Sequence, residues 1–405
     1  MKQHVVSVLA LLSTGLLFQA TPADAEGWDF AGYVAAETRL FINDPAYSNQ
    51  RDDRVSPSLV IEPELVYESN NRQYRFTLVP FARWDAHDEE RQHADLREAN
   101  LLYIKDNLDV LAGIGKVFWG VTESRHLVDI INQTDSVEDI DGEDKLGQPM
   151  LRLNVINDWG TVSAFVLPGF RERTFPAHDA RLRGALVIDT DNPVYESSDG
   201  QSHIDYAVRY AHTLGQWDLG LSYFDGTSRE PRLIPTIKNS QILLVPHYDQ
   251  INQLGLDAQY TGEATLWKLE LISRHGQGRR FVAGVGGLEY TLYGVLNSKA
   301  DLGLIFEYQY DDRNPSEAPA TAADDDFFLG TRLTLNDISD TTFLAGVIID
   351  RHTHSTFYSV EAAYRISNNW KIELEGRFTG GVDENDILYG IRDDDFITLR
   401  LAYFI

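Results

Sequence analysis

The 405-residue sequence predicts an all-β fold, a single transmembrane antiparallel β-barrel of about eighteen strands, with sixteen as the alternative count. Three observations lead to this fold class. Apolar and polar residues alternate along most of the chain, which is strand periodicity. The connections between candidate strands are alternately short and long. Beyond the first 25 residues, no apolar run approaches the roughly 18 residues that a membrane helix needs.

Residues 1–25 have the pattern of a cleaved export signal. A short basic start precedes an almost unbroken apolar run from Val5 to Phe18, and Ala23-Asp24-Ala25 supplies the small residues that signal peptidase requires. We therefore expect residues 26–405 to form the barrel. A membrane anchor is the alternative interpretation, but a helix over this run would rise only about 21 Å, short of the roughly 30 Å hydrocarbon core.

Strand periodicity is clear in segments such as 28–41 and 370–380, where apolar residues share one face and charged residues the other. Segment 108–118 is less regular. The segments expected to form strands are 28–41, 57–68, 72–86, 93–106, 108–118, 149–156, 160–168, 203–214, 217–226, 250–262, 265–274, 281–294, 301–311, 325–336, 340–350, 356–366, 370–380 and 394–405.

The connections between these segments indicate how the barrel is oriented. Asn, Asp and Gly, which tolerate the positive φ of tight hairpins, occur at the short turns. The longer connections are 119–148, 169–202, 227–249, 312–324 and 381–393. Short turns on one side and long loops on the other are typical of an outer-membrane barrel, with the turns in the periplasm and the loops outside.

The tryptophans lie near the ends of the expected strands. An indole ring favours the membrane interface because the ring is apolar while its N–H needs a wet partner. The expected periplasmic ends carry Trp28, Trp159, Trp217, Trp267 and Trp370, and the outer ends carry Trp84 and Trp119. The last segment is amphipathic and is expected to pair with the first, because lipid does not tolerate an unpaired strand edge.

This layout of export signal, paired strands, short Asn/Asp turns and amphipathic terminal strand resembles a Gram-negative porin-type outer-membrane β-barrel. Such chains usually end in Phe, whereas here Phe404 is penultimate. The stretch Gly115-Lys116-Val117-Phe118-Trp119-Gly120, with Glu123-Ser124 and Ile131-Asn132-Gln133-Thr134-Asp135, also resembles a loop signature in uncharacterised porin-like proteins of proteobacteria. The resemblance implies a bacterial outer-membrane location, contacts with lipid, lipopolysaccharide and the barrel-assembly machinery, and a monomer or homotrimer.

The faces opposite the apolar ones carry charges of both signs. An arginine facing hydrocarbon costs about 2–4 kcal/mol at mid-depth, so these side chains are expected to point into the lumen. They favour a polar pathway whose acidic and basic walls orient solutes, and a lumen closed by its own salt bridges is the alternative. The predicted lumen and selectivity residues are Glu37, Arg39, Arg75, Arg83, Arg209, Arg274, Glu307, Arg332, Arg365, Glu373, Glu375, Arg377 and Arg400.

Loop 119–148 is the candidate constriction. It contains apolar residues that a solvated loop would not need, and folding inward would bury them and narrow the pore. Its acidic end predicts a mild cation preference; we interpret that end as solvated, because its spacing does not match a calcium-binding EF-hand loop. No metal site is predicted. The predicted constriction residues are Trp119, Glu123, Arg125, Asp129, Asp135, Asp139 and Asp141.

These expectations favour a passive channel for small hydrophilic or amphiphilic solutes. A closed structural or surface-binding barrel, whose loops bind a partner or lipopolysaccharide, is the alternative, and an outer-membrane hydrolase is a minor one. Ser124, His126 and Asp129 have the residue types of a catalytic triad, but neighbours along a chain rarely have triad geometry. We predict no catalytic residue and no cofactor. The net charge of −27 also argues against nucleic acid as a partner.

Overall fold

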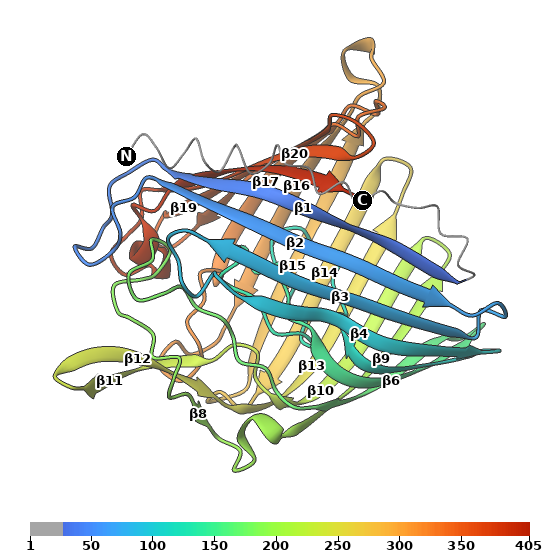
Figure 1. Ribbon diagram of the computed structural model, residues 1–405, viewed down its shortest axis with the longest axis horizontal. Helices are drawn as coiled ribbons and strands as arrows, with labels where there is room; N and C mark the ends of the chain where they lie inside the picture. The colour runs from blue at the N-terminus through green and yellow to red at the C-terminus, as the bar shows by residue number, and fades with distance from the viewer. Residues whose placement is uncertain (1–26) are drawn as a thin grey trace.

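The computed structural model describes residues 27–405, so the expected signal peptide, residues 1–25, lies outside the described residues. Eighteen strands form one antiparallel sheet (Figure 1), which confirms the predicted barrel and its strand count. They are β1 (Trp28–Phe41), β2 (Val55–Glu68), β3 (Tyr74–Asp85), β4 (Ala94–Lys105), β5 (Leu108–Gly115), β6 (Gln148–Asn157), β7 (Gly160–Pro168), β9 (Ile204–Leu214), β10 (Trp217–Thr227), β13 (Gln250–Thr261), β14 (Thr265–His275), β15 (Phe281–Leu292), β16 (Asp301–Asp311), β17 (Asp325–Thr334), β18 (Thr342–Asp350), β19 (Thr356–Arg365), β20 (Trp370–Gly380) and β21 (Phe396–Phe404).

The sheet is closed by its first and last strands. β1 pairs with β2 on one side and with β21 on the other, in a register that runs from Tyr33 opposite Phe404 to Phe41 opposite Phe396. The backbone N–H of Ile405 also donates to the carbonyl of Gly32 at 3.0 Å. Closure leaves no edge strand in the barrel, which is what a hydrocarbon environment requires of a sheet.

Apolar side chains cover the outside of the barrel and polar side chains fill its inside. Phe30 and Leu221 are exposed on the outer face, whereas Glu37 and Arg39 on the inner face are buried. Six tryptophans are exposed near strand ends, but the interface prediction was wrong for Trp119, which is only 5% exposed. Its indole packs edge-on against Phe165 of β7, because the chain after β5 turns into the barrel.

Helical structure is limited to three short 3-10 helices in the described residues, η1 (Gly200–Ser202), η2 (Val295–Asn297) and η3 (Ile387–Ile391). A helix with the length and apolarity to cross a membrane is not found in the described part of the chain.

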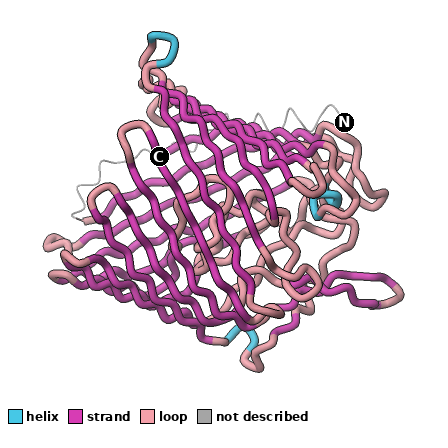
Figure 2. Tube along the Cα trace, turned by 180° about the vertical axis from the view of Figure 1, so that it is seen from behind, coloured by secondary structure: helices cyan, strands magenta, loops and turns pink. Residues whose placement is uncertain are grey.

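The loop expected at 227–249 contains a hairpin that was not predicted. β11 (Arg232–Lys238) pairs with β12 (Gln241–Tyr248), and the short β8 (Val194–Tyr195) runs parallel to β12. Figures 1 and 2 show this hairpin projecting from the barrel at the end that carries the long loops. Residues 242–245 are a continuous apolar run without alternation, so periodicity does not reveal a strand there.

The connection between β5 and β6, residues 116–147, lies inside the barrel (teal to green in Figure 1) and is called the inner loop below. Its apolar residues Leu127, Val128 and Ile131 are buried in one cluster with wall side chains such as Phe165 and Phe224. Burying a side chain of this size contributes about 1.5–3 kcal/mol, so the cluster holds the inner loop against one side of the lumen.

Candidate solute pathway

A cavity of about 1650 Å³ occupies the lumen between the inner loop, the barrel wall and the outer loops. Its lining includes charged residues of β1, β3, β20 and β21 on the wall and of the inner loop. Among the predicted lumen and constriction residues, those that line it are Glu37, Arg39, Arg83, Glu373, Glu375, Arg377, Arg400, Glu123, Arg125, Asp139 and Asp141.

The other predicted residues lie elsewhere. Arg75 and Arg365 are near the short-turn ends of β3 and β19, away from the cavity lining. The remaining wall residues are engaged in pairs within the wall or with the loops, namely Arg209 with Asp257, Arg274 with Glu230, Arg332 with Glu123 and Glu307 with the inner loop. Within the inner loop, the side chains of Trp119, Asp129 and Asp135 are buried and do not line the cavity.

Two buried wall carboxylates clamp the start of the inner loop. Glu270 of β14 accepts hydrogen bonds from the backbone N–H groups of Val121 (2.7 Å), Thr122 (3.1 Å) and Val128 (3.2 Å), and from the Thr122 hydroxyl at 2.7 Å. Glu307 of β16 accepts from the backbone of Glu123 and Ser124 and from the Ser124 hydroxyl, at 2.6–2.8 Å. Hydrogen bonds to a charged acceptor are stronger than neutral ones, so this end of the loop is firmly docked.

The other end of the inner loop meets an arginine cluster, formed by Arg39, Arg83, Arg91 and Arg97. Arg83 lies 3.0 Å from Glu37 and 2.5 Å from Glu138 of the loop. Arg91 bridges Glu37 and Asp85, and Arg97 lies 2.7 Å from Asp135 of the loop. Arg39 donates to the backbone carbonyl of Glu138. The cluster therefore ties the loop to β1, β3 and β4.

Arg91 and Arg97 were not among the predicted site residues. Val79 pairs with Glu98 while Pro80 pairs with Leu96, which leaves Arg97 as the extra residue of a β-bulge in β4. A bulge re-aims a side chain, and here it turns Arg97 toward the inner loop. Strict alternation from the outward-facing Leu101 places Arg97 on the lipid side, so periodicity alone could not find it.

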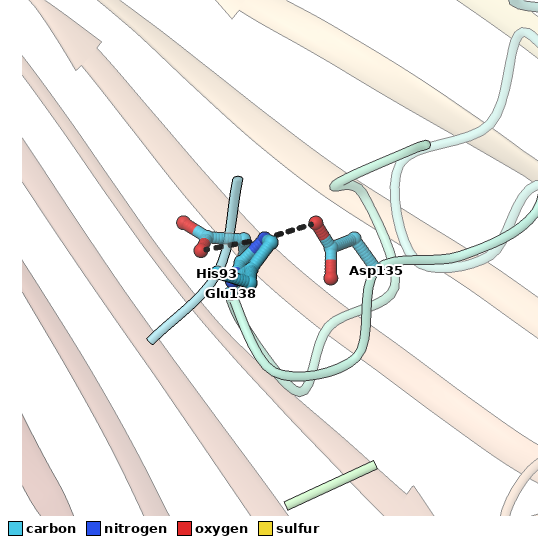
Figure 3. Close-up of side chains that lie close together, drawn as sticks. All are labelled: His93, Asp135 and Glu138. Carbon is cyan, nitrogen blue, oxygen red and sulfur yellow. Dashed lines mark hydrogen bonds and ion pairs between the residues drawn. The ribbon is translucent and has the colours of Figure 1, made fainter. Parts of the chain in front are cut away.

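His93, Asp135 and Glu138 come together where the cluster meets the loop (Figure 3). The His93 Nε2 atom lies 3.3 Å from Asp135 and 3.7 Å from Glu138. Burial opposes protonation of His93, but the two carboxylates outweigh it and raise its pKa. The carboxylates are also paired with Arg97 and Arg83, so a metal ion here would face two guanidinium groups. The three residues act as an ionic contact between loop and wall.

The acidic end of the inner loop has two parts: its first three carboxylates are buried, whereas Asp141, Glu143 and Asp144 are exposed, as expected of a solvated rim. Asp135, Glu138 and Asp139 are at most 7% exposed. Partial desolvation inside the lumen, together with the charge of Asp139, raises the pKa of Asp141 to about 7. Partial desolvation, together with the charge of Glu138, raises the pKa of Asp144 to about 6. These two groups therefore change charge in mildly acidic solution.

If ions pass this loop, the cation preference is expected to weaken as pH falls from about 8 to about 5, a range that spans both raised values. A carboxyl is charged above its pKa and neutral below it, so Asp141 loses its charge first and Asp144 next. Reversal potentials in a KCl gradient measure this. The variant Asp141→Asn should lack the step near pH 7, and a preference that is flat over this range would contradict the assignment.

The three residue types of a catalytic triad do not meet. The Ser124 hydroxyl donates to Glu307 at 2.6 Å, His126 Nε2 lies 3.0 Å from Glu143, and Asp129 pairs with Lys145 at 3.3 Å. Among the described residues no hydrogen bond or ion pair joins two of the three. Ser124, His126 and Asp129 therefore do not form a Ser-His-Asp arrangement.

Closure of the sheet, short turns at one end, long loops at the other and a loop folded into the lumen together define the fold of a porin-type β-barrel. No protein-family model matches the chain, and no curated protein matches it. Solved structures with a similar course of the chain include mutants of the porin of Rh. blastica. One triple mutant is 12% identical over 93% of this chain and 100% of that chain, with a TM-score of 0.44. The loop-L8 deletion mutant of OmpT, an outer membrane protein of Vibrio cholerae, is 11% identical over 94% of this chain and 100% of that chain, with a TM-score of 0.49.

Proposed function

We propose that the protein is a passive channel in the outer membrane of a Gram-negative bacterium, which admits small hydrophilic or amphiphilic solutes. The observation that carries this proposal is the cavity of about 1650 Å³ that remains beside the inner loop. Twelve Arg or Lys and twelve Asp or Glu side chains line it, so the strongly acidic net charge of the chain does not extend into the lumen. Solutes would meet local fields of both signs there.

The outer face of the barrel supports this location. Exposed side chains such as Phe30, Leu221 and Leu329 would form a large apolar surface in water, which soluble monomers rarely have. We propose that membrane lipid and lipopolysaccharide cover this face, that the barrel-assembly machinery inserts the chain, and that it acts as a monomer or a homotrimer.

The second candidate is a closed barrel with a structural or surface-binding role. The ion pairs that join Arg83 to Glu138 and Arg377 to Asp139 favour it, because they hold the inner loop across the lumen. No catalytic role is proposed.

Liposome swelling separates the two candidates. Proteoliposomes that contain the folded barrel should swell in sugars, amino acids and aromatic acids, at rates that fall as the solute becomes larger. Swelling no faster than that of empty liposomes in every solute would support the closed barrel and contradict the channel.

A further inference from the structure

Apart from the cluster that packs on the inner loop, a second part of the inner face of the barrel is apolar and lines the cavity. Phe328 of β17, Ile348 of β18 and Phe357 of β19 are opposite one another in register and face inward. Leu344, two inward positions from Ile348 on β18, continues the patch, and all four side chains line the cavity. We call these four residues the apolar wall. Because the outer face of β18 is also apolar, alternation gives no sign of it.

Two glycines make this surface continuous. The ring of Phe328 lies over Gly330 of its own strand and Gly346 of β18, where an added Cβ would collide with it. An aromatic ring that covers glycines in neighbouring strands stabilises the sheet. Here the ring also leaves an uninterrupted apolar surface toward the cavity, rather than two patches separated by backbone.

Carboxylates border the apolar wall on one side. Arg377 of β20 lies 3.0 Å from Asp139, 2.9 Å from Asp141 and 3.0 Å from Glu361 of β19. Glu375, the next inward residue of β20, lines the same cavity and makes no ion pair with any described residue. We call the four carboxylates, Asp139, Asp141, Glu361 and Glu375, the acidic border. They outnumber the single guanidinium group of Arg377, so the acidic border has an excess of negative charge.

An unpartnered hydroxyl lies beside Glu375. Thr398 of β21 is opposite Glu375 in register, lines the cavity and is only 4% exposed, and its Oγ1 atom has no hydrogen-bond partner among the described residues. Arg39 is opposite Thr398 on the other side; its Nη2 atom donates to the backbone carbonyl of Glu138, and its Nε atom has no hydrogen-bond partner among the described residues. A buried polar atom normally has a partner, so this one points to a ligand group.

The apolar wall and the acidic border are within reach of one small molecule. Leu344, Glu361, Glu375 and Thr398 occupy consecutive positions across β18, β19, β20 and β21. Neighbouring strands are about 4.8 Å apart, so the row passes from an apolar side chain to a free carboxylate over about 10 Å.

We propose that the apolar wall and its acidic border form a subsite for amphiphilic organic cations. The hydrocarbon or aromatic body of the solute packs on Leu344 and on the ring of Phe328, which lies over Gly346. Its protonated amine donates to the Glu375 carboxylate and to the Thr398 hydroxyl, which is a charge-assisted arrangement. The subsite rests on the proposed channel function, because the solute reaches it through the lumen.

Binding of 2-phenylethylammonium to the full-length barrel in lipid nanodiscs, measured by calorimetry at pH 8 with empty nanodiscs subtracted, tests the subsite. Ethanolammonium lacks the aromatic body, and phenylacetate has the opposite charge. We expect 2-phenylethylammonium to bind at least about tenfold more tightly than either. Equal binding of the three probes, or no binding of 2-phenylethylammonium, would overturn the proposal.

Variants separate the two parts of the subsite. Glu375→Gln should weaken the binding of 2-phenylethylammonium about fivefold or more through the lost charge, whereas Leu344→Thr should reduce only its advantage over ethanolammonium. Glu64→Gln is the matched control, because Glu64 is on the inner face of β2, outside the cavity lining and without an ion pair among described residues. An equal loss in Glu64→Gln, or none in Glu375→Gln, would overturn the subsite.

Conductance of the same preparation keeps this result distinct from the channel proposal. A barrel that conducts but does not select the aromatic amine would contradict the subsite alone. A barrel that binds the amine selectively but never conducts would support the subsite and contradict the channel.

Discussion

Replacement of residues 121–146 by a short Gly/Ser linker is expected to raise the single-channel conductance about two- to threefold, because eighteen strands enclose more space than wall side chains fill. The inner loop crosses this space, from its clamp on Glu270 and Glu307 to the arginine cluster. The change also removes Asp139, Asp141 and Asp144 from the cavity, so the cation preference should weaken as well.

Planar-bilayer recordings of the variant and the unmodified barrel measure both effects. Trimming the tip of the β11–β12 hairpin, residues 237–242, is the control, because these residues do not line the cavity. The shift in gel-electrophoretic mobility on heating shows whether the variant is folded. Unchanged conductance of a folded variant that lacks the inner loop would leave this loop without a role in transport.

Glu270→Ala is expected to release the inner loop without removing it. The substitution leaves three backbone N–H groups without their acceptor, whereas the Thr122 hydroxyl can still donate to the Arg125 carbonyl. Each buried donor left unpaired costs about 1–3 kcal/mol, so the docked position should lose several kcal/mol relative to undocked ones. The current through single channels should become noisy, with bursts of larger conductance, and protease should cut the inner loop of the detergent-solubilised barrel faster.

Two further variants serve as comparisons for Glu270→Ala. Glu270→Gln keeps an acceptor oxygen but removes the charge, and should have an intermediate effect. Glu64→Ala removes a carboxylate from the inner face of β2 that accepts no hydrogen bond among the described residues, and should have none. Quiet currents and a protected loop in Glu270→Ala would mean that the apolar cluster around Val128 and Ile131 suffices to hold the loop.

The barrel could be predicted from the sequence because the same physical requirement acts on every one of its strands. Every spanning strand must present apolar side chains to lipid and pair with two neighbours, so alternation and turn chemistry recur along the whole chain. All eighteen expected segments are strands within a few residues of their expected ends. The β11–β12 hairpin lies outside the barrel sheet, where that constraint does not apply, and it was missed.

The pathway was harder to predict because it depends on departures from alternation. Arg97 faces inward only because of a bulge, and Leu344 and Ile348 face inward from a strand that is apolar on both sides. Glu307 and Arg209 have the expected inward direction, yet they bind the inner loop and Asp257 rather than lining the cavity. Periodicity indicates on which face a side chain lies, but not what occupies the space in front of it.

Single-channel recording of the purified full-length barrel in a planar lipid bilayer tests the channel function most directly. The proposed function predicts discrete current steps at neutral pH, with a reversal potential in a KCl gradient that indicates a mild preference for cations. A correctly folded barrel that inserts into the bilayer and gives no current above that of the bare membrane would contradict it.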